Sequence, residues 1–541
     1  MSFEKHTAGL FQFWMKDAGS IIYINPDPTM KMGLESLGVQ SSNMKVVEDI
    51  DCKFRVFHIS EHVVEPVINL IPELQDYIGH LTNPETKREY TWNSELNLDE
   101  RMFPYQVEGV KWAINNKGGY IADEPGLGKT IQALQWLENT PYKKALIVAP
   151  ASVAFNWASE CNEWAKSWMP FTIGTASNLR KVMRDDTYKN SDEKIAYIVT
   201  WAQLALSGEP LLDFGFECMI CDEAHRAKSM QAKRTMYALG LAKRVSSVLL
   251  LSGTPMKSVP AELYPQLRML TNEFGTFDDF ISRYSPPDEL VSKTGTYKVF
   301  RRAKNLPELR QRVMPYMVFR KKADVLQDLP EIRYRKLILP VKNTQMERWA
   351  YMVESMQNGL LDVADLIRFR QEIGISKAKL SLDWIEDNSS ETNPMVVFFV
   401  HKDVRKILEA GLKKKGISFG TIVGDTPKKK RAESIEKFQD GKLQVMLCSE
   451  AAKEGVTLTR ASQLLLLERM WVPTDEEQAE ARVHRIGSKN PVVITHAHSE
   501  DTIDDLIVSK LAKKREIIQT MFSSHLISDD LLSLFLNQVQ L

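Results

Sequence analysis

The stretch that most constrains the fold of this chain runs from Tyr120 to Leu137, with the sequence YIADEPGLGKTIQALQWL. It combines an apolar strand, a turn containing Gly126 and Gly128, and the beginning of a helix. Glycine lets the backbone curl so that its N–H groups point inward, and a helix begins with a partial positive charge. The stretch therefore predicts a loop that cradles phosphate groups.

The residues after the glycines supply the side chains that such a loop needs. Lys129 is placed to reach the β- and γ-phosphates of a nucleotide, and Thr130 to hold Mg²⁺. The usual pattern G-x-x-x-x-G-K-[ST] has glycine where Asp123 stands, so this loop is a variant. The alternative is an ordinary glycine-rich turn, against which the apolar helix face of Ile131 and its neighbours argues.

Composition narrows the class of protein. A chain of 541 residues predicts on the order of three domains. Because 70 basic residues balance 70 acidic ones, contact with nucleic acid requires a local basic groove. We find no apolar run of membrane-spanning length and no secretion signal, so we expect an intracellular protein without a membrane segment. The expected compartment is the cytoplasm or nucleoid if the source is a bacterium or phage, and the nucleus if it is a eukaryote.

The five cysteines indicate a reducing compartment, and Cys218 and Cys221 form the only close pair. Their segment, CMIC, has the pattern of a buried strand. Positions three apart in a strand face opposite sides, so the two thiols cannot share a metal. We expect neither a zinc site nor redox chemistry there.

Two blocks of the chain alternate short apolar runs with helical stretches, which is typical of parallel sheets with crossover helices. The expected strands are YIAD, KALIVAP, AYIVT, CMICDE and SVLLLSGTP in the first block, and MVVFFV, QVMLCS, QLLLLE and PVVIT in the second. The fold class is therefore α/β, with two parallel-sheet lobes. We expect five units: an accessory domain (1–97), a nucleotide-binding lobe (98–270), a helical insertion and linker (271–390), a second lobe (391–500) and C-terminal helices that pack on the core (501–541).

A second motif, CDEAH, ends one of the expected strands. Ligands of open α/β sheets bind at the carboxyl ends of the strands. Asp222 is therefore a candidate to hold Mg²⁺, and Glu223 to polarise the attacking water. The alternative is a structural acidic cap, but in combination with the phosphate loop the motif favours nucleotide hydrolysis.

A third motif is QAEARVHRIG. On a helix, Gln478, Arg482 and Arg485 lie at positions i, i+4 and i+7 of one face. Guanidinium groups suit the charge that develops on a departing γ-phosphate. The alternative is a surface helix whose arginines pair with nearby glutamates. An ATP site completed by a second lobe would couple hydrolysis to lobe closure, as a motor requires.

These motifs belong to a longer ordered series. FPYQVEGV resembles an adenine-reading motif, and DEPGLGKT, CDEAH and LLLSGTP resemble first-lobe helicase motifs. VVFFV, GDTPKKKR, SEAAKEGVTLT and QAEARVHRIGS resemble the second-lobe set, and FRKKADVLQDLP resembles a stretch between the lobes. From about Arg101 to Lys514 the chain thus resembles a helicase-like ATPase of the SWI/SNF type, with two RecA-like lobes. The resemblance implies ATP and Mg²⁺ as cofactors, with ATP contacts at Gln106, Gly126, Gly128, Lys129, Thr130, Gly455 and Gln478, metal contacts at Thr130 and Asp222, and catalysis by Lys129, Glu223, Arg482 and Arg485.

Within this family, SGTPMKSVPAELYPQL, GVTLTRAS and LLLLERMW look most like the annealing-helicase, or HARP-like, fork-remodelling branch. Residues 1–97 stand where that branch carries a substrate-recognition module. Three departures from the commoner pattern are Ala452 and Lys453 in place of a glycine pair, Glu468 in place of an aspartate, and Ser488 in place of a glutamine.

APASVAFNW and IVTWAQL resemble motifs that touch the nucleic-acid backbone. The resemblance places Ser152, Asn156, Thr200 and Ser449 on phosphates, which gives grip without sequence preference. Trp157 either stacks on a base or anchors the loop as an apolar residue.

Three functions are compatible with these features. The first is a monomeric ATPase that translocates on duplex or forked DNA and remodels or reanneals branches. The second is a strand-separating helicase on DNA or RNA, but the segment from Trp471 to Gln478 leaves little room for a separating hairpin. The third is a nucleotide-gated binding protein without turnover, against which the complete set of ATP-site side chains argues. The sequence names no protein partner.

Overall fold

The computed structural model describes most of the chain beyond residue 94, and five strands before it. The described residues are 95–183, 192–292, 295–326, 330–358, 363–452, 456–485, 488 and 491–522. The five earlier strands pair antiparallel in the order β1-β2-β3-β5-β4. Their bounds are Glu4–Ala8 (β1), Phe11–Met15 (β2), Ile21–Ile24 (β3), Gln40–Asn43 (β4) and Arg55–His58 (β5).

Seven parallel strands form the sheet of the first lobe, in the order β14-β6-β11-β10-β7-β9-β8. Their bounds are Gly119–Ile121 (β6), Lys144–Ala149 (β7), Met169–Thr172 (β8), Ile195–Thr200 (β9), Cys218–Asp222 (β10), Ser247–Leu251 (β11) and Met317–Val318 (β14). Apolar runs without alternation favour strands buried on both faces, so helices must cover both sides. The expected parallel α/β lobe is confirmed.

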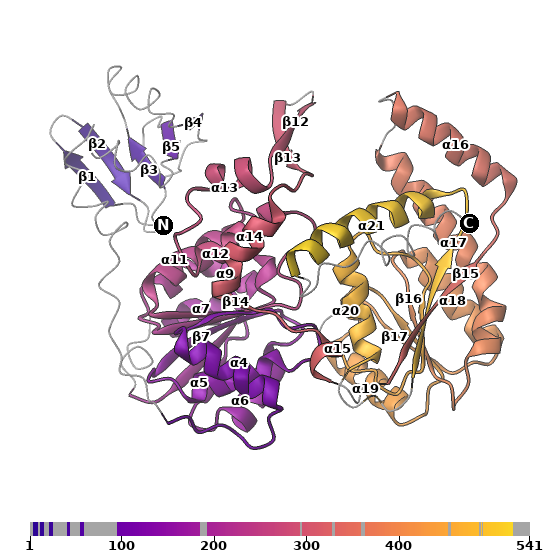
Figure 1. Ribbon diagram of the computed structural model, residues 1–541, viewed down its shortest axis with the longest axis horizontal. Coiled ribbons are helices and arrows are strands. Elements are labelled where there is room, and N and C mark those ends of the chain that lie inside the picture. Colours follow the sequence, from indigo (N-terminus) through magenta and orange to yellow (C-terminus); the bar gives the residue numbers. More distant parts are fainter. Residues whose placement is uncertain are drawn as a thin grey trace.

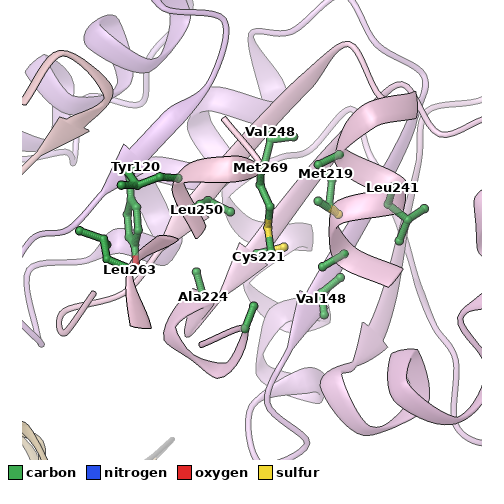
Figure 2. Packing of buried hydrophobic residues seen from close by; sticks show 14 of the residues in the cluster. Tyr120, Val148, Met219, Cys221, Ala224, Leu241, Val248, Leu250, Leu263 and Met269 are labelled. Carbon is green, nitrogen blue, oxygen red and sulfur yellow. The ribbon is translucent and has the colours of Figure 1, made fainter. Parts of the chain in front are cut away.

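The two faces of this sheet have separate hydrophobic cores. Cys218 and Ile220 of β10 lie in one core, whereas Met219 and Cys221 lie in the other. Figure 2 shows part of the second core, in which Met219 packs close to Leu241. The two cysteines therefore lie on opposite faces, as the alternation of a strand requires.

Helices cover both faces of the first sheet (Figure 1). The helices on the face that contains Cys218 are α4 (Pro104–Asn115), α5 (Lys129–Glu138) and α6 (Ala154–Trp164). The helices on the other face are α7 (Ala176–Met183), α9 (Trp201–Ser207), α10 (Glu209–Leu212), α11 (Lys233–Arg244), α12 (Tyr264–Arg268), α13 (Phe277–Tyr284) and α14 (Leu306–Val313).

Six parallel strands form the sheet of the second lobe, in the order β15-β20-β19-β16-β18-β17. Their bounds are Ile332–Ile338 (β15), Met395–Phe398 (β16), Phe419–Ile422 (β17), Val445–Cys448 (β18), Gln463–Leu466 (β19) and Val492–His498 (β20). Apolar residues of α19 (Lys428–Gln439) and α20 (Pro473–Val483) pack on one face. Those of α17 (Val363–Asn388) and α18 (Lys402–Lys414) pack on the other.

The stretch 271–390 departs from the expectation that it is a helical insertion and linker. β14 joins the first sheet and β15 joins the second, and β12 (Pro287–Ser292) pairs with β13 (Gly295–Phe300). β14 has only two residues, and β15 exposes polar side chains such as Arg333 and Arg335 at a sheet edge. Neither strand has the apolar run by which buried strands are predicted. α16 (Asn343–Gln357) and α17 supply the expected helices.

The helix α21 (Ile503–Phe522) joins the two lobes, as Figure 1 shows. Its first half, including Leu511, packs with α16 and α17. Its last turn, including Met521, lies in the core of the first lobe, and the Phe522 ring lies 5.6 Å from that of Phe319. The rest of the expected C-terminal helices, beyond residue 522, lies outside the described residues.

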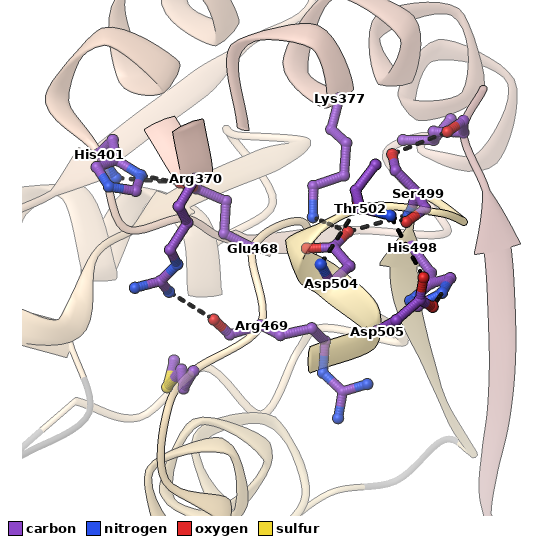
Figure 3. Close-up of polar contacts among 12 residues, drawn as sticks. Arg370, Lys377, His401, Glu468, Arg469, His498, Ser499, Thr502, Asp504 and Asp505 are labelled. Atoms are coloured by element: carbon purple, nitrogen blue, oxygen red, sulfur yellow. Dashed lines mark hydrogen bonds and ion pairs between the residues drawn. The ribbon is translucent and has the colours of Figure 1, made fainter. Parts of the chain in front are cut away.

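Buried ion pairs fix the start of α21 and its surroundings (Figure 3). Lys377 Nζ of α17 lies 2.8 Å from Asp504 Oδ2, and both side chains are buried. Glu468 accepts hydrogen bonds from the backbone N–H groups of Val400 and His401. The usual aspartate has one methylene fewer with which to reach these donors.

Among the described residues, no helix is both long and apolar enough to cross a membrane.

Candidate active site

The predicted phosphate loop lies between β6 and α5, with both glycines in left-handed backbone conformations. Gly126 has a φ of +95° and Gly128 a φ of +72°, angles that residues with a Cβ rarely adopt. An added Cβ on Gly128 would also lie 2.3 Å from Gln106 Nε2. The loop therefore requires glycine at these positions, as a phosphate cradle does.

Lys129 opens α5, and its amine lies within the loop. The Nζ atom donates to Asp123 O at 2.6 Å and to Glu124 O at 3.2 Å. Burial lowers the pKa of Lys129, although the nearby carboxylate of Glu223 opposes this. The amine is thus held inside the loop, where a cation can reach bound phosphates.

Asp123, the departure from the usual loop pattern, has a structural explanation. Its buried carboxylate accepts two hydrogen bonds from Arg320, Nε to Oδ1 at 2.9 Å and Nη2 to Oδ2 at 2.7 Å. Gln132 Nε2 donates to Asp123 Oδ2 at 2.9 Å. Arg320 also donates to Tyr105 O. The aspartate therefore bonds the loop to the segment between the lobes. A glycine at this position would leave the loop backbone without these bonds.

Gln106, the predicted adenine reader, lies beside the phosphate loop at the start of α4. Its side chain is buried, Oε1 accepts from Phe103 N at 3.0 Å, and Nε2 donates to Leu127 O at 3.1 Å. An amide retains one further N–H and one lone pair, so these contacts leave base recognition open.

Asp222 ends β10 and receives hydrogen bonds on both carboxylate oxygens. Trp157 Nε1 donates to Oδ2 at 2.9 Å, and Glu223 N donates to Oδ1 at 2.9 Å. Burial and the neighbouring Glu223 carboxylate raise the pKa of Asp222. A carboxylate in this setting is stabilised in its charged form by a cation.

Glu223 follows in a strained left-handed conformation, with φ of 49° and ψ of 51°. Such strain is concentrated at functional sites. Its Oε2 lies 3.1 Å from His225 Nδ1, which contacts Ser252 Oγ at 2.8 Å. Burial by itself would raise the pKa of Glu223, but the contact with His225 and the nearby Lys129 charge lower it. Glu223 is therefore held as a carboxylate.

The helix α20 of the second lobe faces this site. Gln478 Nε2 lies 3.5 Å from Thr254 Oγ1 of the first lobe, and both side chains are buried. Arg482 donates through Nε to Gln478 O at 3.2 Å. Its charge acts on both Lys129 and Glu223. The structure thus brings Arg482 to the cleft opposite the phosphate loop.

Arg485 does not share the helical face of Gln478 and Arg482, which corrects the expectation. α20 ends at Val483, and His484 is extended because its Nε2 contacts Pro330 O at 2.7 Å. Arg485 still lies over the loop: an added Cβ on Gly126 would lie 3.3 Å from Arg485 Cβ. A turn, and not a helix, therefore brings Arg485 to the phosphate loop.

Lys322, in α15 (Lys322–Val325), connects the phosphate loop with the residues that follow α20. Its backbone N donates to Glu124 Oε2 at 2.8 Å, and its Nζ donates to His484 O at 2.8 Å. Burial and the neighbouring charges of Lys129 and Arg485 lower the pKa of Lys322 to about 8. Four cationic residues therefore lie near the phosphate loop, which suits a polyanionic ligand such as a triphosphate.

Thr130 in the first turn of α5 and Asp222 at the end of β10 are the predicted Mg²⁺ ligands. Among the described residues, no three acidic, histidine or cysteine side chains cluster as a metal site. Mg²⁺ does not need such a cluster, because it keeps several waters and binds one or two carboxylates with substrate phosphates. One hydroxyl and one half-buried carboxylate fit this requirement.

Most predicted nucleic-acid residues lie at the ends of strands and helices. Ser152 and Asn156 are exposed at the start of α6. Thr200 caps α9 and accepts from Gln203 N at 3.2 Å. Ser449 is half-buried after β18. Gly455, a predicted ATP contact, lies outside the described residues.

Trp157 is not available to stack on a base, which corrects its assignment as a nucleic-acid contact. Its side chain is 1% exposed and its Nε1 is bonded to Asp222. The alternative, an anchor beneath the loop, is what the structure has. The indole is amphipathic, and burial against the sheet satisfies both its ring and its N–H.

Sequence reasoning missed Arg320, Lys322, His225 and Trp201. The first two lie in FRKKADVLQDLP, which was singled out as a stretch between the lobes but was given no role. Their partners are far away in sequence, 197 residues in the case of Arg320 and Asp123. The spacing of the motif therefore gave no signal of these contacts.

Two family models match the chain, the SNF2-related domain over residues 105–387 and the helicase conserved C-terminal domain over residues 376–487. The first covers more than half of the sequence. The chain belongs to the SNF2-related family. This confirms the SWI/SNF-type resemblance of the motifs.

Two relatives of this SNF2-related chain illustrate the similarity. The Bos taurus protein named "DNA annealing helicase and endonuclease ZRANB3" is 29% identical over 442 residues, which cover 78% of this chain and 40% of that protein. The Caenorhabditis elegans homolog of SWI/SNF-related matrix-associated actin-dependent regulator of chromatin subfamily A-like protein 1 is 31% identical over 497 residues, which cover 86% of this chain and 68% of that protein. The SNF2-related chain thus spans less than half of the bovine relative.

Among solved structures, the Sulfolobus solfataricus SWI2/SNF2 ATPase core in complex with dsDNA is 22% identical to this SNF2-related chain. The match covers 82% of this chain and 98% of that one, with a TM-score of 0.38.

Proposed function

We propose that this chain is an ATP-dependent DNA translocase that couples ATP hydrolysis to movement on duplex DNA and remodels or reanneals branched DNA. Membership of the SNF2-related family supports the coupling of ATP to DNA. The name of the bovine relative, an annealing helicase, supports the choice of branched DNA. We propose that the protein acts as a monomer in the compartment that contains the DNA, which is the nucleoid of a bacterium or the nucleus of a eukaryote.

The observation that carries the proposal is the meeting of the two lobes at the phosphate loop. Arg485 Cβ and Lys322 Cε would each lie 3.3 Å from a Cβ on Gly126. A triphosphate in the loop would therefore contact cations from both lobes. Those contacts exist only while the lobes are closed. Binding of ATP would therefore close the lobes, and its release would let them open.

This geometry supports the following roles for the site residues that the structure describes. Lys129 binds the β- and γ-phosphates, and Arg482 with Arg485 stabilises the negative charge that develops on the γ-phosphate. Gln106 contacts the adenine base from the start of α4, and Gln478 and Gly455 complete the nucleotide contacts of the second lobe.

Glu223 orients and polarises the attacking water. His225 and Ser252 hold its carboxylate in place, and its lowered pKa keeps it ionised. Thr130 and Asp222 would hold Mg²⁺, which neutralises charge on the β- and γ-phosphate oxygens when bound.

Duplex tracking is favoured over strand separation by the segment before α20. A β-hairpin that could divide two strands needs several residues in each strand. Only one residue separates Trp471 from Pro473, the first residue of α20. The described residues therefore hold no hairpin at this point. Ser152, Asn156, Thr200 and Ser449 would grip phosphates of one strand without sequence preference.

The test compares ATP turnover with single-stranded DNA, duplex DNA, forked DNA and RNA, all at one stated salt concentration because phosphate contacts are salt-dependent. We expect duplex or forked DNA to stimulate turnover most, and branch migration or annealing to require ATP. Robust unwinding of a duplex that has an intact tail would support the strand-separating helicase instead. Nucleotide-dependent DNA binding without turnover would support the gated binding protein.

A further inference from the structure

A hollow of about 390 Å³ opens on the first lobe beside the two segments proposed to contact nucleic acid. Pro150 and Ala151, which precede α6, line one side of it. Residues of α9 line another side, and Arg226, Lys233 and Arg234 also border it. A cationic rim of this kind suits the phosphate backbone of a polynucleotide.

Trp201 connects this hollow to the ATP site. It is the first residue of α9, it lines the hollow, and only 2% of its side chain is exposed. Its Nε1 donates to Asp222 O at 2.8 Å. Trp201 thus borders the hollow while its indole N–H holds the backbone of the proposed Mg²⁺ ligand.

Trp157 reaches the same residue from α6. It follows the exposed Asn156 directly, and its Nε1 donates to Asp222 Oδ2 at 2.9 Å. Asp222 is therefore held twice, by its carboxylate and by its carbonyl, through indoles that belong to the two segments that border the hollow.

We propose that Trp157 and Trp201 are positioning residues through which a polynucleotide in the hollow sets the orientation of Asp222, so that DNA accelerates ATP turnover. This inference rests on the proposed function. It adds the route by which DNA contacts on α6 and α9 reach the nucleotide.

The geometry of the two hydrogen bonds makes this route sensitive to small movements. An N–H donor at 2.8–2.9 Å loses its bond when the distance grows by less than about 1 Å. An indole has one donor and no acceptor. A shift of α6 or α9 would leave that donor buried without a partner, which is unfavourable. The two helices therefore have a preferred position, in which both hydrogen bonds form, and a disfavoured one, in which a bond is lost. A polynucleotide in the hollow can shift the balance between these positions.

The test removes each N–H but keeps an aromatic ring, in Trp157→Phe and Trp201→Phe. Trp168→Phe is the matched control, because Trp168 is also buried and also donates to a carbonyl, Leu137 O at 3.1 Å, which the site does not use. ATP turnover is measured with and without duplex DNA over a range of ATP concentrations. We expect the ratio of stimulated to unstimulated kcat to fall at least tenfold in both site variants, with a smaller change in KM, and to stay within twofold in the control.

A second measurement keeps the indole N–H of both site residues. In protein labelled with 5-fluorotryptophan, the fluorine resonances of Trp157 and Trp201 should move on addition of duplex DNA, while that of Trp168 stays in place. Resonances that stay fixed on DNA binding, or equal losses of stimulation in all three variants, would overturn the inference. If the wild-type protein shows no stimulation by any DNA, the proposed function itself has failed.

Discussion

The Arg320 guanidinium holds the Asp123 carboxylate by two parallel contacts of 2.9 and 2.7 Å. Asp123 stands in the phosphate loop and is fully buried, whereas Arg320 lies between the lobes. The backbones of the two segments are also hydrogen-bonded, because Glu124 N donates to Arg320 O at 3.0 Å. The loop and the inter-lobe segment are thus one bonded unit.

Removal of Arg320 should destabilise this unit strongly. Arg320→Met leaves the buried Asp123 charge without its partner, so we expect the free energy of unfolding to fall by about 3–5 kcal/mol. Arg333→Met is the control, since it breaks an exposed ion pair with Glu331 and should cost at most about 1 kcal/mol. Urea unfolding measures both. Equal losses in the two variants would show that the buried pair has no special role.

Glu223→Gln should abolish ATP hydrolysis and leave ATP binding intact. The amide keeps the shape of the side chain but lacks the negative charge that polarises the water. Binding of a fluorescent ATP analogue and release of phosphate measure the two properties. Glu108→Gln, at an exposed position of α4, should change neither. Hydrolysis that persists in Glu223→Gln would assign the base to another residue.

Arg485→Ala should lower kcat on the order of a thousandfold, because the charge that develops on the γ-phosphate loses a guanidinium partner. Arg485→Lys keeps the charge but loses the planar fork, so we expect an intermediate rate. Single-turnover kinetics separate this effect from nucleotide binding. Turnover within tenfold of the wild type in Arg485→Ala would exclude its proposed role.

Lys322→Met should weaken the closure of the lobes on ATP. The substitution removes the hydrogen bond from Nζ to His484 O and one cation beside Gly126. We expect KM for ATP to rise at least fivefold, with a fall in kcat. Lys321→Met is the adjacent control and should have little effect. A KM that is equal in both variants would place Lys322 outside the nucleotide site.

His496 should make the protein sensitive to mild acid. Burial and the nearby Arg469 lower its pKa to about 3, while an unfolded chain binds a proton there near pH 6.5. Between these values the unfolded state holds more protons, so stability falls as pH falls, by up to about 1.4 kcal/mol per pH unit. Urea unfolding from pH 7 to 5 should show a shallower dependence in His496→Gln. An unchanged dependence would contradict this assignment.

The parts of the site predicted from sequence are those contained in one short stretch. Gly126 and Gly128 were identified because a curled loop needs left-handed backbone angles, and both have them. Asp222 was placed at the end of a strand because an apolar run stops there. The division of the chain into five units stays a prediction, and β14 and β15 show that its boundaries do not follow the sheets.

The parts that sequence reasoning misplaced depend on neighbours from elsewhere in the chain. Trp157 fits both a stacking residue and an anchor, and only its contact with Asp222, 65 residues later, decides between them. Arg485 fits a helical pattern, but the contact of His484 with Pro330 O ends the helix before it.

The sequence by itself determined the two lobes, the phosphate loop and the acidic motif, because apolar periodicity and glycine angles act over a few residues. Tertiary structure alone decided that Arg320 neutralises Asp123 and that two indoles meet at Asp222. Those choices depend on which polar groups are buried together, and burial is set by the packing of strands and helices that are distant along the chain.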